Sequence, residues 1–129
     1  MKRLLSLLSS VIVMLGFHPV KADEFDKNEQ VRAVLRQKGD DGRTPRSIQH
    51  FAYFLTAGER DAFRDLVVER GYAVDDAHAE GSEPRNWTIV FSKIQAPVDL
   101  DDETGTLEIE AKRLQGQYDG WETDVMRQR

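Results

Sequence analysis

The sequence of 129 residues contains no cysteine. This absence excludes disulfides, zinc–thiolate centres, thiol nucleophiles and lipid attachment at a cysteine. With 40% hydrophobic and 32% charged residues, the composition is that of a globular chain, and the length suits one domain with a modest core. The sequence shows no repeat, low-complexity tract or interdomain linker, so we expect a single folded unit.

A hydrophobic run long enough to cross a membrane is also missing. The longest apolar stretch, residues 4–17, is shorter than the roughly 20 residues that a spanning helix needs, and it contains serines. It follows two basic residues and precedes Val20 and Ala22, which suit the −3 and −1 positions of a signal-peptidase site. We therefore expect residues 1–22 to be a signal peptide, with a single membrane anchor as the alternative. The mature domain, residues 23–129, would be periplasmic or secreted.

Basic residues are outnumbered by acidic ones. The chain has 18 Lys and Arg against 23 Asp and Glu, a formal net charge of −5, and loss of the three basic residues of the leader lowers it to −8. Such a surface repels phosphate backbones, because nucleic-acid affinity rests mainly on Lys and Arg. We expect no direct nucleic-acid binding, and no membrane association after leader cleavage. The aromatic residues of the predicted strands also lack the basic stacking motif of RNA-recognition modules: Phe51, Tyr53, Phe54, Trp87 and Phe91.

Periodicity and turn residues divide the mature chain into helices and strands. Thr56 is placed to cap one helix, and Asp99 to cap the next. Tyr118 continues the apolar stripe of that second helix, and the pair Asp119–Gly120 predicts a turn before the last strand. The predicted elements are a helix over 24–39, a loop over 40–46, a strand over 49–56, a helix ending before 71, strands over 72–80 and 87–94, a helix ending at 118, and a strand over 120–126.

After the leading helix, the order is strand, helix, strand, strand, helix, strand. This order is typical of the split βαβ arrangement, in which two helices cover one face of an antiparallel sheet. The first and third strands are central in that arrangement, and here they are also the most hydrophobic strands. The sequence therefore predicts an α+β fold, a ferredoxin-like βαββαβ sandwich with an additional N-terminal helix.

An acidic run invites a metal-binding interpretation. Its carboxylates fall at positions 1, 3, 5 and 12 of a calcium loop: Asp99, Asp101, Glu103 and Glu110. Position 6 must turn sharply, yet it is Thr104, and the glycine follows one residue late. We therefore interpret the run as the acidic start of a helix, and we expect neither a metal nor a cofactor.

The most concentrated polar set outside the helices is Asp40, Asp41, Arg46 and His50. Two carboxylates beside an arginine and a histidine could form an acid–base site, which would suit a small hydrolase or a ligand-binding domain. The alternative, which we favour, is a loop held together by charge-assisted hydrogen bonds. We interpret a second histidine, His78, as a surface histidine.

Two segments carry a resemblance to a known family. The stretch KGDDGRTPRSIQHFAYF and the later stretch GQYDGWE together resemble the regulator of ribonuclease E activity B (RraB) family, over essentially the whole mature chain. The resemblance implies a ferredoxin-like sandwich, no catalysis, and regulation of ribonuclease E by protein contact. The matching residues are Asp40, Asp41, Pro45, Arg46 and His50 in the first segment, and Tyr118, Asp119, Gly120, Trp121 and Glu122 in the second.

The leader separates this sequence from the cytoplasmic members of that family. Our first hypothesis is an exported, non-enzymatic domain that acts by contact with a protein partner, for which the two motifs supply a partner-binding or loop-organising set. A ribonuclease E inhibitor in the cytoplasm, with a misassigned leader, is the first alternative. A small periplasmic hydrolase or ligand-binding domain is the second, and an exported module without a target is the third.

Overall fold

The computed structural model describes residues 10–12, 24–79, 81 and 84–127. The strand β1 therefore falls within the predicted leader, whereas the cleavage site expected after Ala22 lies outside the described residues. The elements, in chain order, are β1 (Ser10–Ile12), α2 (Glu24–Gln37), β2 (Arg46–Phe54), α3 (Ala57–Glu69), β3 (Ala73–Ala79), β4 (Trp87–Gln95), the short 3₁₀ helix η1 (Pro97–Asp99), α4 (Asp101–Arg113) and β5 (Gln117–Asp124).

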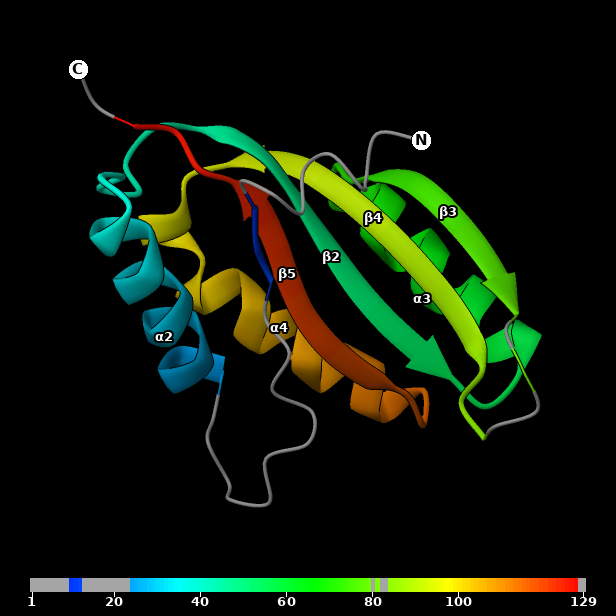
Figure 1. Cartoon of the computed structure of the whole chain (residues 1–129). Coiled ribbons are helices and arrows are strands. Elements are labelled where there is room, and N and C mark those ends of the chain that lie inside the picture. The colour runs from blue at the N-terminus through cyan, green and yellow to red at the C-terminus, as the bar shows by residue number, and fades with distance from the viewer. Residues whose placement is uncertain (1–9, 13–23, 80, 82–83, 128–129) are drawn as a thin grey trace.

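The strands form one antiparallel sheet in the order β1-β5-β2-β4-β3. Without β1, this is the strand order of the ferredoxin-like sandwich, with β2 and β4 at the centre as the sequence predicts. Figure 1 shows α2, α3 and α4 on one side of the sheet. The α+β fold class is therefore confirmed. β2 begins at Arg46, three residues earlier than expected, because Arg46 already pairs with Gln95 of β4.

Two hydrophobic clusters lie between the sheet and the helices. The first cluster lies under α3 and α4 and is built of Ala52, Phe54, Phe63, Val67, Tyr72, Ile89, Phe91, Leu107, Ala111 and Tyr118. The second cluster lies under α2 and consists of Val31, Leu35, Ile48, Leu100 and Trp121. Because α2 shares the second cluster with β2 and β5, the additional helix is part of the domain core.

Local sequence signals explain where the helices begin. The N-cap of α3 is Thr56, whose hydroxyl accepts a 3.1 Å hydrogen bond from the backbone N–H of Glu59, as predicted. The predicted cap at Asp99 is wrong, because Asp99 lies in η1 and α4 begins at Asp101 after Leu100. Pro97 lies at the start of η1, a position that its fixed φ suits.

The segment that leads into β5 also differs from the prediction. Helix α4 ends at Arg113, and Gln115 adopts a φ of 62°, which reverses the chain. Tyr118 therefore lies in β5, and its helical spacing is coincidental. Asp119 and Gly120 do not form a turn. They lie within β5, where Gly120 has a φ of 97° and the register with β2 shifts, so this pair forms a β-bulge.

Candidate functional site

The first motif folds around a buried ion pair between the 40–46 loop and β2. Both nitrogens of the Arg46 fork contact the Asp40 carboxylate, at 2.6 Å for Nη1–Oδ2 and 3.0 Å for Nη2–Oδ1. Asp40 also accepts bonds from the backbone N–H groups of Gly42 (2.9 Å) and Met126 (2.7 Å). Arg46 donates in turn to the carbonyl of Asp124 at 3.0 Å. The pair therefore holds both its own loop and the C-terminal end of β5.

Hydrogen bonding decides the charge state of Asp40. Its side chain is fully buried, and burial opposes ionisation. The bonds from Arg46, Met126 and Gly42 outweigh burial and lower the pKa of Asp40 below its usual value. Asp40 is therefore an ionised structural anchor whose oxygens are already occupied. By contrast, Asp41 is exposed and accepts a bond from the backbone N–H of Arg43 at 3.0 Å.

His50 lies at the centre of a second buried network, on the sheet face that carries the helices. Its Nδ1 lies 2.8 Å from the hydroxyl of Tyr118, and its Nε2 lies 2.9 Å from Oε1 of Gln95. Gln95 continues the chain by donating from Nε2 to the hydroxyl of Tyr72 at 3.2 Å. That hydroxyl donates to Oε2 of Glu103 at 2.6 Å. The network thus links three strands to α4.

The donors and acceptors of this network fix a neutral histidine. Because Oε1 of Gln95 can only accept, Nε2 of His50 carries the proton, and Nδ1 accepts from the Tyr118 hydroxyl. His50 is fully buried and stacks on Phe91, with ring centroids 5.3 Å apart. Burial lowers the pKa of His50 to about 4. His50 is therefore uncharged near neutral pH and serves as a core residue.

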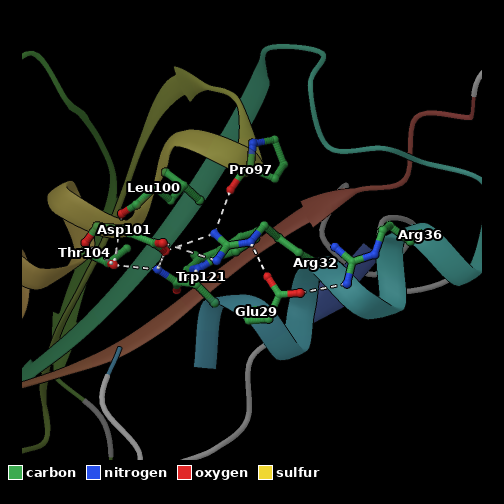
Figure 2. Close-up of polar contacts among 9 residues, drawn as sticks. Glu29, Arg32, Arg36, Pro97, Leu100, Asp101, Thr104 and Trp121 are labelled. Carbon is green, nitrogen blue, oxygen red and sulfur yellow. Dashed lines mark hydrogen bonds and ion pairs between the residues drawn. The ribbon is translucent and has the colours of Figure 1, made fainter. Parts of the chain in front are cut away.

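The second motif contributes Trp121, which joins β5 to the two helices beside it. Its indole Nε1 donates a 2.8 Å bond to Oδ1 of Asn28 in α2. The amide nitrogen of Asn28 donates to Oγ1 of Thr104 at 2.7 Å and to Oδ1 of Asp101 at 3.0 Å, both in α4. Figure 2 shows Arg32, Asp101, Thr104 and Trp121 gathered between these elements. Asn28, Thr104 and Trp121 are buried, so the bonds form within the core.

Arg32 reinforces the same contact between α2 and α4. Its Nη1 lies 3.0 Å from Oδ1 of Asp101 and 3.2 Å from the carbonyl of Pro97, and its Nε lies 3.0 Å from Glu29 (Figure 2). Arg32 is 7% exposed. These interactions fix α2 against η1 and the start of α4. The first helix of the domain is therefore held firmly against the rest of the fold.

The remaining motif residues lie in β5. Glu122 is buried and pairs with Gln49 across the sheet. Asp119 is half-buried, and burial raises its pKa, although Lys27 of α2 and a bond from Tyr53 act in the opposite direction. Gly120 supplies the positive φ of the bulge. This part of the motif therefore determines the shape of the strand.

The predicted set does not converge on one point. The network of Asp40 and Arg46 lies at the C-terminal end of β5, whereas His50 bonds to Tyr118 and Gln95 instead. Sequence reasoning missed Asn28, Arg32, Tyr72 and Gln95. One signal was available: Asn28 precedes Val31 and Leu35 by three and seven residues and so shares the apolar stripe of α2. An asparagine on an inward stripe requires a buried partner.

Two further findings concern membrane spans and metal sites. None of the described helices is long and apolar enough to cross a membrane. Within the ranges that the structure describes, no group of three or more His, Asp or Glu side chains is placed to hold a metal ion.

One of two comparisons with known proteins identifies a family for this chain. A comparison with curated proteins returned no match. The family described as regulator of ribonuclease activity B matches residues 25–123, a span that runs from the start of α2 almost to the end of β5 and includes both motifs. The chain therefore belongs to the RraB family.

Proposed function

We propose that this chain is an exported RraB-family domain that acts by contact with a protein partner and has no catalytic activity of its own. The observation that carries the proposal is that the motif residues serve the fold of the domain itself. Asp40, Arg46, His50 and Trp121 are all buried, and each is bonded to other residues of the domain. They support the fold itself, so contact with a partner is left to the surface of the domain; the match to a family of regulators supports this proposal.

The geometry gives little support to a hydrolase or ligand site. Such a site needs Asp40, Arg46 and His50 to meet in an open cleft. Asp40 and Arg46 instead neutralise each other in the interior, and burial lowers the pKa of His50. A general base also needs an accessible nitrogen, yet both ring nitrogens of His50 are occupied.

A cytoplasmic ribonuclease E regulator is the second candidate, and one observation favours it. Ser10–Ile12 of the predicted leader pairs with Glu122–Asp124 as the fifth strand of the sheet. A segment that completes the sheet has a structural role in the uncleaved chain. Under this candidate, the leader stays attached, and the partner is ribonuclease E, as the family resemblance of the sequence implies.

Capture of the partner inside cells tests the proposal. The full chain with a C-terminal affinity tag is crosslinked in living cells, and a matched chain that starts at residue 23 and stays in the cytoplasm is the control. We expect one exported protein to be crosslinked to the full chain only and to bind the purified domain again. Absence of any such protein would contradict the proposal. Inhibition of purified ribonuclease E by the domain would favour the second candidate.

A further inference from the structure

The two edges of the sheet differ in how well they are protected. At one edge, β3 carries a register shift between Val74 and Asp76, and its Asp75 and Asp76 are exposed. A bulge and charged side chains are the usual protection of an edge strand against pairing with another chain. At the opposite edge, β1 covers the C-terminal part of β5, Glu122–Asp124. The two edges are therefore protected in different ways. β3 is protected by its own bulge and charged side chains, whereas β5 is protected by a segment of the predicted leader.

The pairing of β1 shows what the β5 edge accepts. Ser10, Val11 and Ile12 lie opposite Asp124, Thr123 and Glu122, in antiparallel register. β1 also lies close to α2, so a strand added at this edge lies beside this helix. Two of its three residues, Val11 and Ile12, are β-branched, a residue type that favours strands. The edge thus binds a short, extended segment rich in β-branched residues.

Removal of residues 1–22 would uncover this edge without removing the core. Both hydrophobic clusters are built from residues between Val31 and Val125, and the family match begins at residue 25. The cleaved domain therefore keeps every core residue named above. It also loses the strand that pairs with Glu122, Thr123 and Asp124, and this part of β5 becomes an edge of the sheet.

A second copy of the chain is a poor occupant of this edge. If two β5 strands paired antiparallel about Thr123, Glu122 of each copy would lie opposite Asp124 of the other. Like charges directly opposite each other destabilise a sheet. A partner segment of the same character as β1 brings no such repulsion.

We infer that the β5 edge of the cleaved domain binds an extended, apolar, β-branched segment of the partner protein as an antiparallel strand, in the place that Ser10–Ile12 occupies in the uncleaved chain. This inference rests on the proposed function and supplies its mode of contact. Backbone hydrogen bonds give such a contact its affinity, and alternate side chains give it specificity. In the uncleaved chain, the leader competes for the same edge.

A peptide of the leader itself is the probe. Residues 8–15, LSSVIVML, are synthesised with two added C-terminal lysines and titrated onto the domain of residues 23–129. We expect saturable binding, and slower amide exchange at residues 122–124 but not in β3. The full chain, whose own β1 occupies the edge, binds the peptide at least tenfold more weakly. Protection of β3 instead, equal binding by the full chain, or no binding would overturn the inference.

Two N-methylated peptides separate strand pairing from general hydrophobic contact. Neighbouring N–H groups of a strand point to opposite sides, so only one of Val11 and Ile12 can donate to β5. Methylation of the backbone nitrogen that donates to β5 should weaken peptide binding by about tenfold. Methylation of the backbone nitrogen that points away from β5 should leave the affinity nearly unchanged. Equal affinity of the two peptides would contradict strand addition, and so would dimerisation of the domain without peptide.

The test of this edge and the test of the function can fail separately. If a captured partner remains bound in the presence of saturating peptide, the inference on the edge fails while the proposed function stands. If no partner is captured, the proposed function fails, and the peptide titration still reports whether the edge accepts a strand.

Discussion

The indole nitrogen of Trp121 lies 2.8 Å from the side-chain oxygen of Asn28, a residue 93 positions earlier in the chain. This bond joins the last strand of the domain to its first helix. Both side chains are fully buried or nearly so, and Asn28 uses its amide nitrogen to bond Thr104 as well. One asparagine thus fixes three elements at a single point in the core.

Replacement of this asparagine should show the cost of unpaired polar groups. Asn28→Ala leaves the indole N–H of Trp121 buried without a partner, and we expect a loss of about 2 kcal/mol in the free energy of unfolding. Gln30→Ala, at an exposed position of the same helix, is the matched control and should change stability by less than about 0.5 kcal/mol. Urea unfolding of the two variants measures the difference. Equal stabilities would show that the bond contributes nothing.

The pair of Asp40 and Arg46 predicts a non-additive effect. Asp40→Ala strands the buried charge of Arg46, and we expect it to cost about 3–5 kcal/mol of folding stability. Addition of Arg46→Met to Asp40→Ala should restore part of that loss, because the uncompensated charge is gone. The exposed neighbour variant, Asp41→Ala, should cost less than about 1 kcal/mol. A double-mutant cycle by urea unfolding measures the coupling, and additivity of the two changes would contradict it.

His50 predicts the pH dependence of stability. Its pKa falls to about 4 in the folded state, below the usual value of about 6.5. Between these two values the unfolded chain binds a proton that the folded chain does not. Stability is therefore complete above about pH 6.5 and declines as the pH falls towards 4, by about 1 kcal/mol per pH unit for one proton.

The two histidine variants isolate this contribution. His50→Gln should remove most of the slope between pH 5 and pH 6.5, whatever its effect on absolute stability. His78→Gln, at the partly exposed histidine of β3, should retain it. Urea unfolding at several pH values gives the slopes. An unchanged slope in His50→Gln would show that His50 is not the titrating group.

Substitution of glycine by alanine at two positions should have opposite effects on the stability of the domain. A Cβ atom at Gly116 would lie 2.2 Å from Cδ2 of Phe54 and 2.7 Å from the carbonyl oxygen of Tyr53, so Gly116→Ala should destabilise the domain strongly. At Gly105, inside α4, a Cβ atom would meet nothing within 4 Å. Gly105→Ala should therefore stabilise the domain by about 0.5–1 kcal/mol. Thermal unfolding of the two variants checks both signs, and a loss of stability in Gly105→Ala would be the contrary result.

Residue patterns predicted the elements whose signals are local. The apolar stripes of α2 and α3, the Thr56 cap and the hydrophobic central strands each report their own structure within a few residues. The predictions were wrong where a residue matched the helix period by coincidence, beyond a helix end that no typical residue marks. Tyr118 matches the helix period, but the positive φ of Gln115 ends that continuity, and glutamine is not a residue that signals such a conformation.

The internal networks were beyond the reach of local patterns. Asp40 and Arg46 are close in sequence, and their motif could be interpreted from the sequence as a pair that organises a loop. Asn28 and Trp121, or His50 and Gln95, meet only after the sheet and helices pack. Their hydrogen bonds depend on tertiary register, which is not encoded by spacing along the chain.

The central claim is that this RraB-family domain works outside the cytoplasm. The most direct measurement is cell fractionation of the tagged full chain followed by N-terminal sequencing of the purified protein. The account predicts a periplasmic or secreted protein whose first residue is Asp23. A cytoplasmic protein that keeps residues 10–12 would contradict it and would assign β1 permanently to the sheet.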